Sequence, residues 1–355
     1  MFGALKRVGS LKSLGVSLAF AVVAGAYGGG VAAQDPLRVS IWGGSWRDFV
    51  AENIGKRFTA ETGVPVEYIT GGTIDRLNKA KLSKANPETD IIFTTSHVGW
   101  LYASDDLYER LDLAKLPNAK TMFPEAVISP FHLGTWSYVY TIAYRPDLVP
   151  ADIKFSSWAD LWNPRLKGML GLPDFDPSHI IYAAAVLSGA KSPKDWAMGQ
   201  KRLLELKPNI KAFYSSDATS QEKIGSGETP VQVLLSGNAY HMISQGVKIN
   251  LVVPKEGAVI GIDTAGINKG SKKQDLAYRF INIALDPATQ TLVANKQKMG
   301  PVSSQAKVDP DVAKMPGLFT TAQQWKEQAM VIEHKQRAEL LGEWRKWFTE
   351  NVIAR

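Results

Sequence analysis

The sequence contains no cysteine among its 355 residues. This absence excludes disulfide bonds, a thiol nucleophile and any metal site built on thiolates. The chain also lacks the Gly-x-Ser-x-Gly elbow, the His-Glu-x-x-His helix, the Walker loop and the Rossmann glycine fingerprint. Its five histidines are scattered without the spacing of metal ligands. The sequence therefore favours a protein that binds over one that catalyses, and neither a metal nor a cofactor is expected.

Basic charge is also too sparse to indicate a nucleic-acid partner. The formal net charge is +7, from 41 basic and 34 acidic residues. Three of the basic residues, Lys6, Arg7 and Lys12, lie in the first 33 positions, so the remainder of the chain carries only +4. Nucleic-acid-binding proteins usually present a clustered basic stripe. We therefore expect a small-molecule ligand and no nucleic acid.

The first 33 residues have the pattern of a secretory signal peptide. Their basic start is followed by an apolar run from Leu14 to Ala26, by three glycines and by Val31-Ala32-Ala33. Small residues at that position favour cleavage after Ala33. A membrane anchor is the alternative, but the run is shorter than the roughly 20 apolar residues of a spanning helix. The pattern predicts a periplasmic protein whose residues 1–33 are removed.

The rest of the chain alternates between predicted strands and helices. A first series places strands at 37–41, 64–68 and 90–93, and a second series places them at 168–172, 210–214, 231–235 and 249–253. Two further strands, at 134–144 and 258–262, are candidates for crossovers between the series. The C-terminal stretch 321–353 has a helical pattern. This order predicts two interleaved α/β domains joined by a hinge of crossover strands, as in binding proteins that close around a ligand.

The predicted boundaries follow from these crossovers. Residues 34–138 and 263–310 are assigned to the first lobe. Residues 139–262 and 311–355, with the C-terminal helices, are assigned to the second. Such a protein is expected to act as a monomer.

Small, hydroxyl-bearing or acidic residues follow the predicted strands, where open α/β sheets bind their ligands. Glycine allows a ligand to approach the backbone, and helix N-termini present free N–H groups there. Ordinary strand-to-helix turns favour the same residues, and this remains the alternative for each loop. The candidate ligand-binding residues are Trp42, Gly43, Gly44, Ser45, Gly71, Gly72, Thr73, Thr95, Ser96, Trp136, Asp174, Ser178, Ser215, Ser236 and Asp263.

Several segments resemble the periplasmic solute-binding proteins of the spermidine/putrescine-binding type, which serve ABC importers. The most specific is Ser156–Pro164, with Lys167-Gly168 after it. Other matching segments are Phe58–Val66, Asp90-Ile91-Ile92, Val253–Gly257 with the following Asp263, and Phe280-Ile281-Asn282 with Pro287. The resemblance implies a two-lobed periplasmic-binding-protein fold of the second type. It also implies a membrane permease as partner and no catalysis.

The resemblance is weaker for the ligand. Polyamine binders of this type stack the ligand on aromatic side chains and place carboxylates at its amino ends. Here Leu235 and Gly261 stand where two aromatics are expected, and only Asp263 clearly matches a family carboxylate. The glycine-rich loops, with Arg47 and Arg76 nearby, suit an anion. We therefore expect an anionic or zwitterionic solute. A polyamine is the alternative, and a secreted enzyme on the same fold is the alternative from another class.

Overall fold

The structure is a computed structural model that describes residues 34–354. The predicted signal peptide and its cleavage position lie outside the described residues. Asp35–Arg355 forms one compact unit. Within the described part of the chain, no helix is both long and apolar enough to cross a membrane.

The first strand-to-helix series follows the sequence pattern closely. It comprises β1 (Leu37–Ile41), α1 (Ser45–Val50), α2 (Lys56–Thr62), β2 (Val66–Thr70), α3 (Thr73–Leu82), β3 (Ile91–Thr95) and α4 (Ser96–Ser104). A π-helical turn at Ala51–Gly55 joins α1 to α2, so the single helix predicted here is continuous but not regular. Gly63 ends α2 in the left-handed conformation (φ 74°), which glycine adopts without steric cost.

The second series builds the other half of the sheet. It comprises β5 (Leu170–Pro173), α5 (Ser178–Leu187), α6 (Gln200–Leu206), β6 (Ile210–Tyr214), α7 (Asp217–Ser226), β7 (Val231–Leu235), α8 (Ser236–Ser244) and β8 (Asn250–Val252). We call the β1–β3 half with its helices the first lobe and the β5–β7 half with its helices the second lobe. Both lobes place the helices directly after the strands, as predicted.

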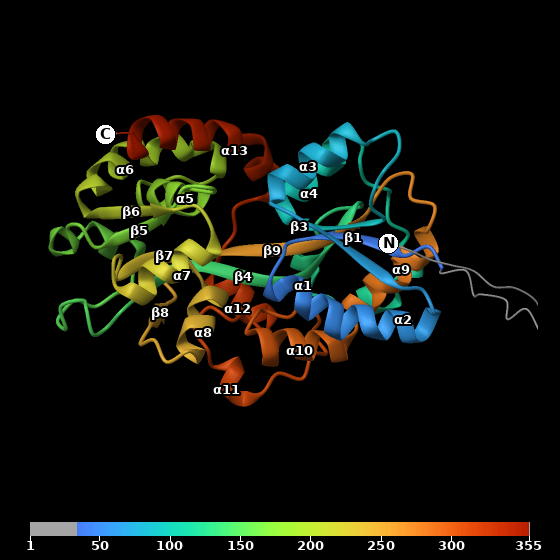
Figure 1. Cartoon of the computed structure of the whole chain (residues 1–355). Coiled ribbons are helices and arrows are strands. Elements are labelled where there is room, and N and C mark those ends of the chain that lie inside the picture. The colour runs from blue at the N-terminus through green and yellow to red at the C-terminus, as the bar shows by residue number, and fades with distance from the viewer. Residues whose placement is uncertain (1–33, 355) are drawn as a thin grey trace, which may run out of the picture. The chain divides into compact units, whose positions relative to one another are not determined.

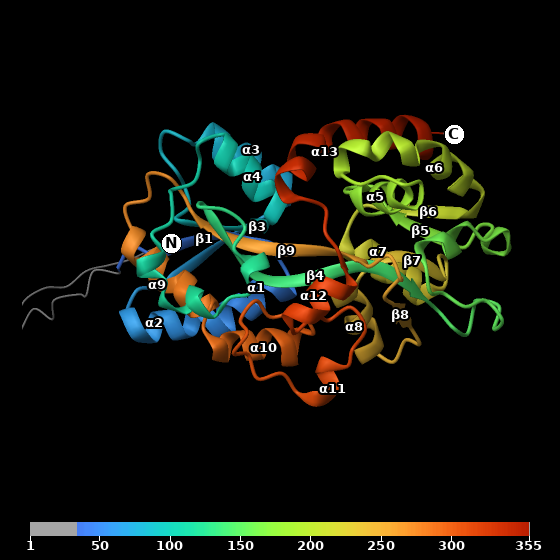
Figure 2. The ribbon, with the colours of Figure 1, turned by 180° about the vertical axis from the view of Figure 1, so that it is seen from behind.

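Two long antiparallel strands connect the lobes. They are β4 (His132–Tyr144) and β9 (Ala258–Ile267), and the sheet order is β2-β1-β3-β9-β4-β7-β5-β6. Both strands run through the middle of the molecule in Figure 1 and Figure 2. Their register places Trp136 opposite Asp263 and Tyr138 opposite Gly261. The alternation in 134–144 suggested one buried face, but nearly all of β4 is buried because both faces of the sheet are covered.

The remaining helices cover this framework. They are α9 (Gln274–Ala284), α10 (Pro287–Gln297), α11 (Pro310–Ala313), α12 (Ala322–Gln328) and α13 (His334–Phe348). The helical pattern predicted over 321–353 forms two helices, because β10 (Ala329–Met330) separates α12 from α13 and pairs in parallel with β9. Met330 and Ile332 are buried while Val331 is exposed, and this period of two suits an extended segment.

The helix α13 spans the two lobes. It packs against α4 of the first lobe and against α5 of the second, and both views show it beside α5 and α6. Trp344 is fully buried, and Trp196 packs edge-on against both Trp344 and Trp347. The C-terminal tryptophans therefore anchor α13 to the second lobe.

Two of the sequence motifs bind each other. Ser157 Oγ donates to Glu256 Oε1 (2.6 Å), and the backbone N–H of Trp158 donates to Glu256 Oε2 (3.1 Å). The indole Nε1 of Trp158 donates to the carbonyl oxygen of Gly257 (2.8 Å). One carboxylate therefore satisfies two donors at the start of the Trp158 segment and fixes that segment to the turn before β9.

We predict that Glu256→Ala lowers the free energy of unfolding by about 1–3 kcal/mol, because it leaves two partly buried donors without an acceptor. Urea denaturation followed by tryptophan fluorescence measures this change. Glu343→Ala, at an exposed position of α13, is the matched control and should change stability by less than about 0.5 kcal/mol. Equal stability of the two variants would contradict the structural role of Glu256.

Candidate ligand-binding site

The helices of both lobes begin at the side of the sheet where the two strand series end. Ser96, Ser178 and Ser236 are each the first residue of a helix, and each is buried. Asp217 begins α7 in the same way. Thr95, the last residue of β3, lies opposite Asp263 in the register of β3 with β9. The crossover strand β9 therefore brings the ends of the first-lobe strands to a buried carboxylate.

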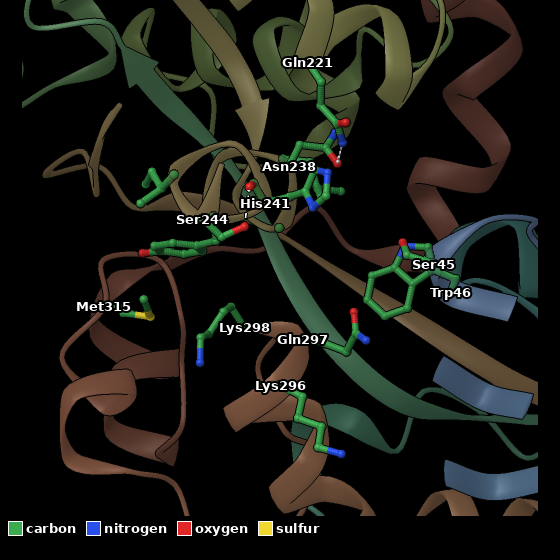
Figure 3. A pocket seen from close by; sticks show the side chains of 14 residues that line it. Ser45, Trp46, Gln221, Asn238, His241, Ser244, Lys296, Gln297, Lys298 and Met315 are labelled. Carbon is green, nitrogen blue, oxygen red and sulfur yellow. Dashed lines mark hydrogen bonds between the residues drawn. The ribbon is translucent and has the colours of Figure 1, made fainter. Parts of the chain in front are cut away.

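A cavity of about 500 Å³ opens between elements of the two lobes. This volume lies within the usual range for small-molecule sites, about 300–1,000 Å³. In Figure 3 Ser45 and Trp46 lie on one side, and Asn238 and His241 lie on the other. The lining residues are Ser45, Trp46, Gln221, Leu235, Gly237, Asn238, Tyr240, His241, Ile243, Ser244, Lys296, Gln297, Lys298 and Met315.

An aromatic stack leads from this cavity to the interior. Trp46, which lines the cavity, lies flat on Trp136 with a ring-centroid distance of 5.0 Å and an interplanar angle of 5°. Phe93 stacks on Trp136 at 5.7 Å. The Nε1–H of Trp136 donates to Asp263 Oδ2 at 2.7 Å. The stack therefore ends in a carboxylate whose orientation is fixed by an indole hydrogen bond.

Asp263 is only 5% exposed, and its Oδ1 has no hydrogen-bond partner among the described residues. Burial raises the pKa of Asp263 to about 8, even though the hydrogen bond from Trp136 lowers it. The carboxylate of Asp217 raises that pKa further, while Arg76 and the nearby hydroxyl of Tyr138 lower it. An unpartnered carboxyl oxygen in the interior is costly. The arrangement suits a cationic donor brought by a ligand.

A second acid lies beside the cavity. Asp217 Oδ1 accepts from Asn238 Nδ2 at 2.8 Å, and Asn238 Oδ1 accepts from Gln221 Nε2 at 3.1 Å. Asp217 is reachable by solvent, yet the surrounding protein desolvates its carboxyl and raises its pKa. Asn238 and Gln221 line the cavity, and Asp217 lies behind Asn238 in its wall.

A third acid is already paired. Asp176 Oδ2 accepts from Arg337 Nη2 at 2.7 Å, and the same Nη2 lies 3.0 Å from His179 Nε2. His97, on α4 of the first lobe, is 3.6 Å from Asp176 Oδ2. Burial acts to raise the pKa of Asp176, but Arg337, His179 and His97 outweigh it and hold that pKa well below its ordinary value. The cluster joins both lobes and α13.

The histidine in this cluster is neutral. Burial and the charge of Arg337 lower the pKa of His179 to about 3. Its Nδ1 donates to the carbonyl oxygen of Asp176 (3.1 Å), which leaves Nε2 as the acceptor for Arg337. Tyr140 stacks on the His179 ring with centroids 3.7 Å apart. The imidazole is therefore a fixed spacer between α13 and β4.

The structure brings some of the sequence-predicted residues together and leaves others apart. Trp42 Nε1 donates to Thr73 Oγ1 (2.8 Å), so the first two predicted loops contact each other. Gly43 and Gly44 are exposed beside Ser45, which lines the cavity, and Gly71 and Gly72 are exposed at the start of α3. Ser236 accepts from the backbone N–H of Val139. Of the fifteen candidates Ser45 alone lines the cavity, so Asp263, Trp136 and the rest lie outside its lining.

The two arginines near the glycine loops are bonded to the protein. Arg76 is buried and donates to the carbonyl oxygens of Gly71 (3.0 Å) and Phe93 (2.7 Å). Its guanidinium lies over the Trp42 ring at 5.2 Å. Arg47 pairs with its neighbour Asp48. Neither arginine lines the cavity, and the Nη2 of Arg76 is buried without a hydrogen-bond partner among the described residues.

Sequence reasoning missed Arg337, Asn238 and Tyr138. The case of Tyr138 is instructive, because Gly261 stands where an aromatic was expected. A Cβ at Gly261 would lie within the ring of Tyr138, which faces it across the β4–β9 pair. The neighbouring strand therefore supplies an aromatic ring at this place. The register of β4 with β9 was the signal that would have shown it.

We predict that Gly261→Ala destabilises the protein by about 1–3 kcal/mol, because its Cβ overlaps the Tyr138 ring. In a Tyr138→Ala background the same change should cost at least about 1 kcal/mol less. Gly43→Ala is the control, since no atom lies within 4 Å of its Cβ position. Thermal denaturation of the four-member cycle measures the coupling, and additive costs would show that the two residues do not compete for space.

Two α/β lobes joined by crossover strands, with a cavity between them, define the class of hinged binding proteins. Comparison with known proteins agrees. Residues 53–320 match the family of bacterial extracellular solute-binding proteins. The spermidine/putrescine-binding periplasmic protein of Escherichia coli is 26% identical over 261 residues, covering 70% of this chain and 74% of that protein. The putrescine/cadaverine-binding protein of Pseudomonas aeruginosa is 27% identical over 339 residues, covering 88% and 94%.

A solved structure of an ABC transporter protein from Clostridium perfringens is similar to 89% of this chain and 99% of its own. Its TM-score is 0.76 and its identity 27%. The chain belongs to the bacterial extracellular solute-binding protein family. The predictions of the two-lobed fold and of an ABC-transporter substrate-binding protein are confirmed.

Proposed function

We propose that this chain captures a small organic solute through an ammonium group, which binds the carboxylate of Asp263. The observation that carries the proposal is the unpartnered Oδ1 of this buried acid. A primary ammonium has three donors and no acceptor, so it matches such an oxygen in charge and in hydrogen bonding. Trp136 is covered by Trp46 and Phe93, so the rest of the ligand passes the edge of this stack toward the cavity that Trp46 lines.

The charges around the site support a cation. The negative charge of Asp217 repels that of Asp263, whereas the positive charge of Arg76 attracts it. The guanidinium of Arg76 is held by two carbonyl oxygens, so the protein itself compensates the acids only in part. A cation over an aromatic face gains a further attraction. Two relatives are named as spermidine/putrescine-binding and putrescine/cadaverine-binding proteins, and these names support the same class of ligand.

The sequence also favoured an anionic or zwitterionic solute. A zwitterion is compatible with an ammonium at Asp263. A purely anionic solute would bring its charge toward two carboxyls, and it remains a separate prediction. The pH dependence of binding distinguishes a ligand with an ammonium group from a purely anionic ligand.

We predict that affinity for an ammonium ligand rises between pH 6 and pH 8. Asp263, with a pKa of about 8 in the unoccupied protein, is protonated at pH 6 and must lose its proton to bind a cation. The association constant should increase by up to about tenfold per pH unit below pH 8 and level off above it. Isothermal titration calorimetry with putrescine and 4-aminobutanoate in buffers of different ionisation enthalpy measures both the affinity and the released proton.

Asp263→Asn should weaken binding at pH 8 and remove most of this dependence, leaving only the weaker contribution of Asp217. Asp311→Asn, at an exposed aspartate of α11, is the control and should bind as the unaltered chain does. Affinity that falls as the pH rises from 6 to 8 would point instead to an anionic ligand.

The biological role that we propose is delivery of this solute to a membrane permease. The chain acts as a monomer in the periplasm and changes no covalent bond of its ligand. The lobes divide within β4 and β9, at 138/139 and 262/263. Unaltered recovery of the ligand after prolonged incubation would support this role. Steady consumption of the ligand would support the competing proposal of a secreted enzyme.

We predict that protein taken from the periplasm of a bacterial host begins at Gln34. Signal peptidase cuts after small residues such as Ala33, which would leave 322 of the 355 residues. N-terminal sequencing and intact mass measure the cut, and Ala33→Asp should leave the precursor uncut at this position. Retention of the full chain in the membrane fraction would instead indicate an anchor.

A further inference from the structure

The acid Asp176 is compensated by the protein itself. Its Oδ2 accepts from Arg337 Nη2 (2.7 Å), and its Oδ1 accepts from the backbone N–H of Ser178 (3.1 Å). Asp176 is 9% exposed and Arg337 is 2% exposed, so both charges are withdrawn from solvent. In a buried pair of this kind the guanidinium compensates the charge of the carboxylate. Asp176 is therefore not free to bind a second ammonium.

A row of rings on β4 connects the pair to the proposed ammonium site. Trp136 bonds Asp263, Tyr138 packs edge-on against Tyr140 (6.2 Å), and Tyr140 stacks on His179 (3.7 Å), which contacts Arg337. Burial is the largest cause that raises the pKa of the Tyr138 hydroxyl. The charge of Asp263 raises this pKa further, and Asp176 and Asp217 also contribute. Arg337 lowers that pKa. All four charged groups thus lie near one side chain of β4. At one end of this row Asp263 has no cation bonded to it, and at the other end Asp176 has its own cation.

The compensated end also contains donors without acceptors. Arg337 Nε and Ser178 Oγ are buried, and neither has a hydrogen-bond partner among the described residues. Ser178 has no measurable exposure. Leaving such groups unpaired in the interior is costly. They come from α5 and α13, and each is available to donate to an acceptor that a ligand brings.

We infer that Arg337 is a specificity-determining residue that selects ligands with one ammonium end and one carboxylate end, and disfavours diamines. The ammonium binds Asp263, and the carboxylate accepts from Arg337 Nε and Ser178 Oγ. In a diamine the second ammonium would meet a guanidinium instead. This inference rests on the ammonium site proposed above and names the class of ligand as ω-amino carboxylates.

The position of Arg337 connects the discrimination between ligands to the closure of the two lobes. Arg337 lies on α13, which packs on both lobes, and His97 of the first lobe approaches Asp176 to 3.6 Å. His334 of α13 bonds Ser96 at 2.9 Å. A ligand carboxylate at this place would contact the side chains that hold α13, α4 and α5 together. Discrimination should therefore be expressed in the closed arrangement.

The test compares ligands that differ only at the second end. Diamines, ω-amino carboxylates and simple alkylamines of three to five carbons are titrated calorimetrically into the chain without its first 33 residues. At the best chain length, the amino carboxylate should bind the unaltered protein roughly 10- to 100-fold more tightly than the diamine, as expected for one charge-assisted hydrogen-bonded contact. The alkylamine should lie between them.

Arg337→Gln should reverse this order, because it frees Asp176 for a second ammonium. Arg337→Lys is the matched control: it keeps a cation beside Asp176 and should still disfavour diamines, but it lacks Nε–H and should lose part of the carboxylate preference. Asp176→Asn provides a test that does not depend on the folding of the Arg337 variants. It leaves the guanidinium uncompensated and should strengthen the preference for amino carboxylates.

The outcomes separate the two proposals. Diamines that bind the unaltered chain as tightly as amino carboxylates, or gain affinity in Asp176→Asn, would overturn the role of Arg337 while the ammonium site stands. Failure of all three amine series, with or without binding of dicarboxylates, would contradict the ammonium site itself and this inference with it.

Discussion

The antiparallel pairing of β4 with β9 is the constraint on which the site depends. These strands are the central pair of the sheet, and they carry the chain between the lobes. Their register fixes Trp136 opposite Asp263, which sets the indole hydrogen bond, and it seats the Tyr138 ring over Gly261. A slip of one residue would turn every side chain to the other face of the sheet. The aromatic wall and the buried acid would then separate.

The electrostatic character of the cleft follows from how each acid is compensated. Asp176 has a guanidinium within hydrogen-bonding distance, Asp217 has an amide, and Asp263 has an indole and one free oxygen. Burial has different consequences in the three cases, because it is the partner that decides which form of the carboxyl is stable. The three aspartates can therefore have three different protonation equilibria.

The sequence predicts the secondary-structure elements of this protein better than the contacts between residues that are far apart in the chain. The strand-to-helix alternation fixed most element positions, and the motif before Asp263 located the buried acid in β9. The sequence did not reveal Tyr138 as the substitute for an aromatic at Gly261, because that depends on strand register. Arg337 was missed because it lies 161 positions from Asp176, with only an ordinary helix around it. Local patterns predict elements, whereas charge partners across such distances depend on the assembled fold.

The same separation along the chain has a consequence for biogenesis. A polypeptide exported from its N-terminus presents Asp176 long before Arg337 emerges, and until then this acid has no guanidinium beside it. The helix α13 ends only seven residues before the C-terminus. A chain cut short anywhere before α13 would therefore keep a buried acid uncompensated and leave the cleft loosely held. The compensation of Asp176 is therefore complete only once the chain has been synthesised through α13.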